Sequence, residues 1–138
     1  MYTNAEEIKA QLMAQNEADG PIFKMKNDPR ITKVGKIIRK LSLDELPQVF
    51  NVINGDMSLV GPRPAVPKEV VEYTPHQLRR LDAIPGLTGL QQVSGRSDLD
   101  FEQWIAYDLQ YIEEQSVVTD VKILLMTVPA VLTGKGAY

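Results

Sequence analysis

The spacing of apolar residues predicts a chain built mostly of short helices. In four segments the apolar positions recur every three or four residues, as in an amphipathic helix. These segments are residues 5–12, 32–41, 46–53 and 101–112. A last helix, over about residues 117–132, is apolar nearly all round and contains Pro129, which we expect to kink or end it. This helix is too short to span a bilayer, so it either fills the core or lies against a membrane or a partner chain.

Capping residues predict where several of these helices begin. Thr3 has glutamate three residues later, the spacing of a capping box. Thr32 is placed to cap the second helix, and Thr74 is followed by Pro75, which suits the first position of a helix. We expect the first helix to end near Asn16, before a break at residues 19–21.

Shorter stretches have the pattern of extended chain. Residues 22–26 alternate apolar and basic side chains, and residues 57–60 form a short apolar run. Residues 90–93 read as a strand that follows a tight, glycine-rich loop at residues 84–89. The expected fold class is therefore α+β, with residues 1–138 forming a single compact, mostly helical domain that contains a small β-hairpin.

Composition excludes several kinds of chemistry. The 138 residues include no cysteine, which rules out disulfides, thiolate catalysis and zinc–sulfur sites. The single histidine, His76, argues against a histidine metal cluster or a serine–histidine triad. We expect His76 to lie exposed in the first turn of a helix and assign it no role.

The charge of the chain is unevenly distributed. Residues 24–40 hold seven basic residues and one acid and carry +6, which leaves −9 on the rest of a chain whose net charge is −3. This segment is either a solvated helix face or a seat for anionic headgroups or a diphosphate. A nucleic-acid partner is not expected, because the basic residues lack interleaved aromatic side chains and the whole chain is acidic.

An acid pair near the start of a predicted helix is the main candidate for chemistry. The helix begins either with a capping box from Ser42 to Glu45 or with Pro47 at its first position. Either start places Asp44 and Glu45 at its positive end, where acids often only complement the helix dipole. The following loop holds Arg63 between two prolines. Such a set suits phosphate esters, because glutamate can hold Mg²⁺, aspartate can attack phosphorus and arginine can fork onto phosphate oxygens.

Three motifs, in this order, resemble the bacterial sugar transferase family. They are Ser-Leu-Asp-Glu-Leu-Pro-Gln at 42–48, Asn-Val-x-x-Gly-Asp-Met-Ser-Leu-Val-Gly-Pro-Arg-Pro at 51–64 and Pro-Gly-Leu-Thr-Gly-Leu-Gln-Gln-Val-Ser-Gly-Arg at 85–96. The family comprises monotopic polyprenyl-phosphate phosphoglycosyl transferases, which begin exopolysaccharide, capsule and O-antigen assembly in bacteria. The resemblance covers residues 19–138.

The resemblance implies an activity and a set of site residues. A sugar-1-phosphate would pass from a UDP-sugar to undecaprenyl phosphate, with UMP leaving. Asp44 would attack the β-phosphorus to form an aspartyl phosphosugar, and Glu45 would hold Mg²⁺. Arg39, Arg63 and Arg96 would position phosphate oxygens, although exposed surface roles for Arg39 and Arg96 stay open. The family usually has a small polar residue where this chain has Leu41, a difference that concerns packing more than chemistry.

The helix at residues 101–112 carries an aromatic and aliphatic stripe with one acid near it. We interpret the stripe, which includes Trp104, as core rather than as a platform for a sugar. Asp108 falls near this apolar face and needs a partner there, so we expect it to hold Arg96 or Arg63 in place.

The family normally has a hydrophobic helix in the membrane, upstream of the region that this chain resembles. No run in the sequence approaches the ~20 apolar residues of a membrane span. We therefore expect the soluble catalytic portion of a longer protein at the cytoplasmic face of the bacterial inner membrane. The alternative is an inactive module that binds nucleotide sugar or pairs with a second copy as a homo-oligomer.

Overall fold

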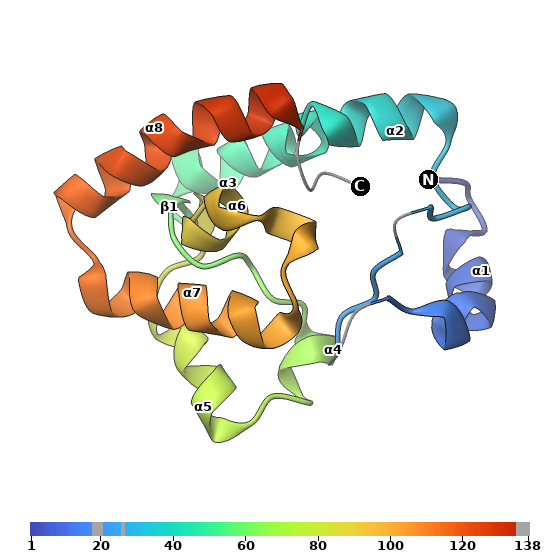
Figure 1. The fold of residues 1–138 in the computed structure, drawn as a ribbon, viewed down its shortest axis with the longest axis horizontal. Helices are drawn as coiled ribbons and strands as arrows, with labels where there is room; N and C mark the ends of the chain where they lie inside the picture. Colours follow the sequence, from blue (N-terminus) through green and yellow to red (C-terminus); the bar gives the residue numbers. More distant parts are fainter. Residues whose placement is uncertain (18–20, 26, 135–138) are drawn as a thin grey trace.

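The computed structural model describes residues 1–17, 21–25 and 27–134, and most of this chain is helical (Figure 1). In chain order the elements are α1 (Ala5–Leu12), η1 (Met13–Gln15), α2 (Lys33–Lys40), η2 (Leu43–Gln48), α3 (Val49–Asn54), β1 (Ser58–Val60), α4 (Pro67–Val70), α5 (Pro75–Leu78), η3 (Arg79–Asp82), β2 (Gly86–Thr88), α6 (Leu90–Ser94), η4 (Arg96–Asp98), α7 (Phe101–Glu114) and α8 (Val117–Thr133), where η denotes a 3₁₀ helix. The mostly helical fold is confirmed.

The small sheet is parallel, so the predicted β-hairpin is wrong. Strand β1 pairs with β2, with Ser58 opposite Gly86 and Val60 opposite Thr88. Between the two strands the chain passes through α4, α5 and η3, as a parallel connection requires. Residues 90–93, predicted as a strand, form helix α6, because Leu90 and Val93 sit three residues apart and pack together against the core.

Three glycines allow the loops at the ends of this sheet to touch. A Cβ atom on Gly61, Gly86 or Gly89 would collide with backbone atoms of the facing segment. The amide of Gly61 donates to the carbonyl of Thr88, and the amide of Gly86 donates to the carbonyl of Pro62, both at 2.9 Å. These glycines therefore fasten the loop that carries Arg63 to the second strand.

Helix α7 supplies most of the first core cluster. Phe101, Ile105 and Leu109 are buried, as predicted, and they pack with Tyr73 and Ile22. The helix begins at a capping box formed by the Asp100 side chain.

A second core cluster joins α8 to the sheet. It consists of Val60, Tyr111 and Ile123, with α6 packed against it. The Tyr111 hydroxyl lies 2.8 Å from Oδ1 of Asp120 and 3.2 Å from the carbonyl of Val60. Burial, with the Asp120 carboxylate beside it, raises the pKa of Tyr111 to about 12. Helix α8 is thus anchored through one face.

The remaining faces of α8 lie on the surface. Ile123 is its single buried residue, while most of its other apolar side chains are exposed. Pro129 does not end the helix, which continues to Thr133. No helix among the described residues is both long and apolar enough to cross a membrane. In Figure 1, α8 and α2 lie along the top of the molecule, α7 crosses its middle and α5 lies at the bottom.

The capping predictions have mixed outcomes. Thr32 accepts a hydrogen bond from the third helical amide of α2, and Thr74 caps α5 with Pro75 at its start, both as predicted. The box predicted from Thr3 is wrong, since α1 has Asn4 at its N-cap with no side-chain hydrogen bond. His76 is exposed in α5, as expected. The predicted break at 19–21 falls mainly on residues outside the described chain, as does Lys26 at the end of the alternating stretch.

Candidate active site

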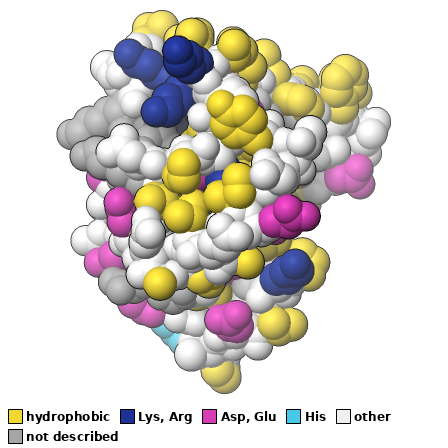
Figure 2. Space-filling view, turned by 90° about the vertical axis from the view of Figure 1, so that its right-hand side faces the viewer, with side chains coloured by type: hydrophobic (Ala, Val, Ile, Leu, Met, Phe, Trp, Pro, Cys, Tyr) yellow, Lys and Arg dark blue, Asp and Glu magenta, His cyan; other side chains and the backbone are white. Residues whose placement is uncertain are grey.

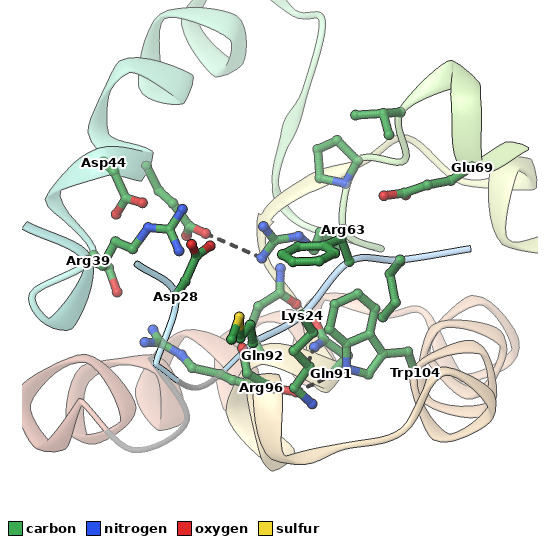
Figure 3. A pocket seen from close by; sticks show the side chains of 18 of the residues that line it. Lys24, Asp28, Arg39, Asp44, Arg63, Glu69, Gln91, Gln92, Arg96 and Trp104 are labelled. Atoms are coloured by element: carbon green, nitrogen blue, oxygen red, sulfur yellow. Dashed lines mark hydrogen bonds and ion pairs between the residues drawn. The ribbon is translucent and has the colours of Figure 1, made fainter. Parts of the chain in front are cut away.

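Segments from across the sequence line one open cleft of about 430 Å³ (Figure 3). Both carboxylates of the acid pair and all three arginines of the predicted site line this cleft. They are Asp44, Glu45, Arg39, Arg63 and Arg96. They come from η2, α2, the loop after β1, and η4. The fold thus brings together five charged residues that the sequence singled out separately.

The acid pair lies in a 3₁₀ helix rather than at the start of an α-helix. Asp44 and Glu45 belong to the first turn of η2, and α3 follows directly. Ser42 has a left-handed backbone conformation (φ 54°) and makes no capping hydrogen bond, so the capping box predicted there is wrong. Asp44 is exposed and Glu45 is half-buried, so both carboxylates remain accessible from the cleft.

Arg63 lies between a carboxylate and an aromatic ring. Its Nη1 is 3.5 Å from Oε1 of Glu45, a long ion pair between partly exposed side chains. On the other side its guanidinium carbon is 6.0 Å from the centre of the Trp104 ring. Neither contact holds the guanidinium tightly, so an anionic ligand can compete for it.

Trp104 has a second role besides the predicted one. It packs against the first core cluster but is only partly buried, and it also lines the cleft. Its indole Nε1 donates to the backbone carbonyl of Arg96 at 3.0 Å. Gln91 donates to the same carbonyl at 3.4 Å. The core helix α7 therefore helps to place Arg96 at the cleft.

Arg39 stands in the last turn of α2, close to a buried ion pair. Arg30 contacts Asp28 at 2.6 Å and binds it through several hydrogen bonds. This arginine holds the pKa of Asp28 below its usual value despite burial. The positive charge of Arg39 lowers the pKa of Asp28 further, by a smaller amount. Asp28 therefore stays charged beside Arg39, and both line the cleft.

The cleft contains both non-glycine residues with positive φ in the described chain. These are Ser42 (φ 54°) and Arg96 (φ 52°). For a residue with a Cβ atom this conformation costs about 1–2 kcal/mol, and such strain concentrates at functional sites. Here it occurs two residues before Asp44 and at one of the predicted phosphate ligands.

Asp108 does not hold Arg63 or Arg96 directly, so that prediction is corrected. It lies 2.6 Å from Arg80, and both side chains are almost completely buried, at 2% and 3% exposure. Burial raises the pKa of Asp108 to about 6, although Arg80 and, more weakly, Arg63 favour its charged form. Asp108 is not among the residues that line the cleft.

Arg80 is the residue that sequence reasoning missed. It donates to the backbone carbonyl of Arg63 and to the hydroxyl of Tyr73, both at 2.9 Å. Its neighbour Arg79 is exposed and pairs loosely with Glu113 at 3.6 Å. Two adjacent arginines look alike in the sequence, and only the packing of η3 against α7 decides which one is buried.

The residues of the cleft can support one kind of metal site. Within residues 1–17, 21–25 and 27–134 there is no group of three or more histidine or acidic side chains that could hold a metal ion. Glu45 nevertheless offers an accessible carboxylate at the cleft. A Mg²⁺ ion is commonly held by one or two carboxylates together with substrate phosphates and water, so this donor set fits Mg²⁺ that arrives with a diphosphate.

The sequence of this chain matches a family of known proteins. The family model described as bacterial sugar transferase matches residues 1–134. The galactosyl transferase CpsE of Streptococcus agalactiae is 51% identical over 138 residues, which cover 99% of this chain and 31% of the relative. The undecaprenyl-phosphate galactose phosphotransferase of Salmonella typhimurium is 48% identical over 145 residues, which cover 100% of this chain and 30% of that protein.

A third relative is the UDP-glucose:undecaprenyl-phosphate glucose-1-phosphate transferase of Caulobacter vibrioides. It is 46% identical over 130 residues, which cover 87% of this chain and 49% of the relative. The chain therefore spans less than half the length of each of these three proteins. Because the family model covers nearly the whole chain, this protein belongs to the bacterial sugar transferase family.

Proposed function

We propose that this chain carries the catalytic residues for transfer of a sugar-1-phosphate from a UDP-sugar to undecaprenyl phosphate. The observation that carries the proposal is the meeting of Asp44, Glu45 and three arginines in one cleft. The names of the Salmonella and Caulobacter relatives describe transfer to undecaprenyl phosphate, and the Caulobacter name specifies UDP-glucose and glucose-1-phosphate. This reaction would begin the assembly of a surface polysaccharide.

In the first step a carboxylate oxygen of Asp44 attacks the β-phosphorus of the UDP-sugar. The new bond joins that oxygen to phosphorus, while the bond from phosphorus to the oxygen of the UMP phosphate breaks. UMP leaves with the electron pair, and the sugar phosphate remains on Asp44 as an acyl phosphate. The exposure of Asp44 at the cleft supports this role, because an attacking oxygen has to reach the ligand.

In the second step an oxygen of undecaprenyl phosphate attacks the same phosphorus. The bond between phosphorus and Asp44 breaks, the carboxylate is restored and the product is a polyprenyl diphosphate sugar. Two displacements at one phosphorus allow the nucleotide to leave before the lipid enters. One cleft can therefore serve two substrates in turn.

Arginines from three segments would bind the phosphates. Arg63 has only a 3.5 Å contact with Glu45, so a diphosphate can draw its guanidinium away. A planar guanidinium can then donate two parallel hydrogen bonds to phosphate oxygens. Arg39 and Arg96 line the same cleft and would complete the cationic wall.

Glu45 would hold Mg²⁺ together with the phosphates of the donor. When bound, the ion neutralises the diphosphate and stabilises the charge that develops on UMP. Movement of Arg63 from Glu45 to a phosphate would leave the Glu45 carboxylate available as a ligand. Donor binding and metal binding would then be coupled through this one ion pair.

The lipid substrate would enter from the cytoplasmic leaflet of the membrane, against the face formed by α2, α3 and α8. Apolar side chains are exposed along all three helices, including Ile37, Phe50, Ile53 and Leu125. Figure 2 shows hydrophobic side chains along the top of the molecule beside a cluster of lysine and arginine. Apolar and basic side chains on one face suit an interface with anionic lipid.

The nucleophile can be tested in the full-length protein. Asp44→Asn replaces the nucleophilic carboxylate with a neutral amide and should reduce UMP release from UDP-sugar to background. Asp56→Asn, at an exposed acid outside the cleft, is the matched control and should retain activity. Near-normal turnover in Asp44→Asn would show that this aspartate is not the nucleophile.

The metal ligand can be tested separately. Glu45→Gln should shift the magnesium dependence of UMP release to higher concentration, and an unchanged titration would contradict the assignment. Calorimetry of this chain with UDP-sugar and Mg²⁺ separates the active transferase from the binding module proposed as an alternative. Binding without UMP release would favour the module.

A further inference from the structure

We propose that Arg80, Asp108 and Tyr73 form a buried clamp that positions Arg63 by holding its backbone carbonyl. This inference rests on the proposed function, because it treats Arg63 as a phosphate ligand. Arg80 is then a positioning residue, acting on the substrate through Arg63 rather than by contact. We call the three residues the Arg80 clamp.

The geometry of the clamp is defined by three contacts of one guanidinium. Nη2 of Arg80 donates to the carbonyl oxygen of Arg63 at 2.9 Å. Nη1 donates to the hydroxyl of Tyr73 at 2.9 Å, and Nη2 also lies 2.6 Å from Oδ2 of Asp108. The three partners come from the loop after β1, from the loop between α4 and α5, and from α7. Arg80 therefore ties the Arg63 loop to the core helix.

Arg80 holds the peptide that follows Arg63, whereas the peptide before Arg63 is held by the amide of Gly86, which donates to the carbonyl of Pro62. The residues on either side of Arg63 are prolines, which have no N–H to donate to a neighbouring strand. Its side chain is about half exposed (47%) and has only the 3.5 Å contact with Glu45 and the face of Trp104 beside it. The direction of the guanidinium is thus set mainly by where the peptide is held.

The clamp is poorly optimised for stability alone. Nε of Arg80 has no hydrogen-bond acceptor, and Oδ2 of Asp108 makes no well-aligned hydrogen bond despite its 2.6 Å separation from Arg80. A buried ion pair with such gaps is often less stable than apolar residues of the same volume. Arg80 lines the cleft and holds the loop that forms part of its wall. Apolar side chains could not hold this loop, because they cannot donate a hydrogen bond to the Arg63 carbonyl.

The single tryptophan allows the clamp to be tested without substrate. Trp104 is the only tryptophan in the chain, and Arg63 lies beside its ring. Arg63→Ala should increase quenching of its fluorescence by acrylamide, because the ring becomes more accessible. Arg80→Met should produce the same increase, and the double variant should show no more than either single variant. The adjacent exposed Arg79→Met is the control and should match the unmodified chain.

Donor binding provides the second readout, by calorimetry with UDP-sugar and Mg²⁺. Arg80→Met should weaken binding by about 10-fold, close to the loss in Arg63→Ala. In the Arg63→Ala background it should cause no further loss. If the full loss persists in that background, or if quenching and binding are both unchanged, Arg80 does not act through Arg63 and the proposal is wrong.

Conservative variants keep the test valid if Arg80→Met does not fold. Tyr73→Phe removes only the hydroxyl that fixes Nη1, and Arg80→Lys keeps the charge but loses the fork. Both should increase Trp104 quenching by less than Arg63→Ala, and no increase in either would overturn the clamp. If the unmodified chain binds no UDP-sugar, the proposed function fails, while the quenching series still decides whether Arg80 positions Arg63.

Discussion

The guanidinium of Arg63 is the point at which the contacts of the cleft converge. Glu45 attracts it from one side, the Trp104 ring lies on the other and Arg80 holds the backbone beneath it. A residue whose backbone is held through its carbonyl can keep a weak side-chain contact that a ligand later replaces. Arg63 therefore combines a defined position with a replaceable partner.

At this scale the shape of the cation matters as much as its charge. Arg63→Lys keeps the positive charge but cannot form two parallel hydrogen bonds with a phosphate. In the full-length protein we expect kcat/KM for UMP release to fall by about 10- to 100-fold. Arg79→Lys, an exposed arginine outside the cleft, should leave the rate unchanged. Equal rates for Arg63→Lys and the unmodified protein would exclude a forked phosphate contact.

Asp108 gives a pH dependence whose sign can be worked out. Its pKa is about 6 in the folded chain, compared with an ordinary value of 3.8, because burial outweighs the attraction of Arg80 and Arg63. The folded state therefore holds this proton more tightly than the unfolded chain does, and the contribution of Asp108 to stability falls as pH rises from about 4 to about 6. Above that range the contribution no longer changes.

Urea denaturation across this pH range tests the assignment. Asp108→Asn should remove the corresponding part of the slope of unfolding free energy against pH, whereas Asp56→Asn should not. Tyr73 also lies near Asp108, but it does not titrate in this range, since burial raises the pKa of Tyr73 above its usual 10. Identical slopes in Asp108→Asn and the unmodified chain would contradict the raised pKa.

At the scale of elements, the two-stranded sheet connects the segments that line the cleft to the hydrophobic core. Strand β1 leads into the loop of Arg63, and β2 leads through Gly89 into α6, whose glutamines line the cleft. Helix α8 contacts both strands and α6 from the other side. Displacement of one strand would therefore shift both walls of the cleft.

A methyl group at the strand contact tests this connection. Gly86→Ala would place a Cβ atom against the backbone of Val60 and Gly61, which cannot move aside as a flexible side chain can. We expect a loss of at least about 3 kcal/mol in unfolding free energy. Leu87→Ala in the same strand should cost only about 1–2 kcal/mol, because it removes a partly buried side chain without a collision. Similar losses in the two variants would mean that the close contact is not critical.

At the scale of the whole molecule, the distribution of apolar surface is uneven. Helix α3 exposes Phe50 and Ile53 at 70% and 74%, and α8 exposes apolar residues along most of its length. An exposed apolar face of this extent normally meets a membrane or another protein. Helix α2, which carries part of this apolar surface, also supplies Arg39 to the cleft, so a lipid surface bound there would lie against an element of the cleft wall.

Vesicle binding tests the membrane assignment. The chain should sediment with vesicles that contain anionic phospholipid, and binding should weaken as salt is raised. Phe50→Ser should reduce the partition coefficient by about 10- to 100-fold, since a buried phenylalanine contributes about 1.5–3 kcal/mol. Val71→Ser, at an exposed position near α4 and α5, should have no effect. If Phe50→Ser binds vesicles as well as the unmodified chain, this surface does not bind the membrane. The surface would then pair two copies of the chain, and analytical ultracentrifugation would detect the dimer.

Local signals in the sequence accounted for much of the fold. The limits of α2 and α8 and the start of α5 followed from apolar spacing and from caps such as Thr32 and Thr74, because helix formation and capping depend on residues within one turn. The pairing of the strands did not follow, since it joins segments separated by two helices and depends on the close approach of Gly61 and Gly86. A short apolar run with glycine nearby reads equally well as strand, loop or helix.

The sequence by itself determined which residue types are available for chemistry. It supplies an adjacent acid pair and arginines within long, ordered motifs, and it contains no cysteine. Only the tertiary structure decided that Arg39, Arg63 and Arg96 share one cleft with that pair, and that Asp108 reaches Arg63 through Arg80. The physical reason is range. Propensity and capping act over a few residues, whereas burial, ion pairing and strand contact depend on segments that meet only after the chain has folded.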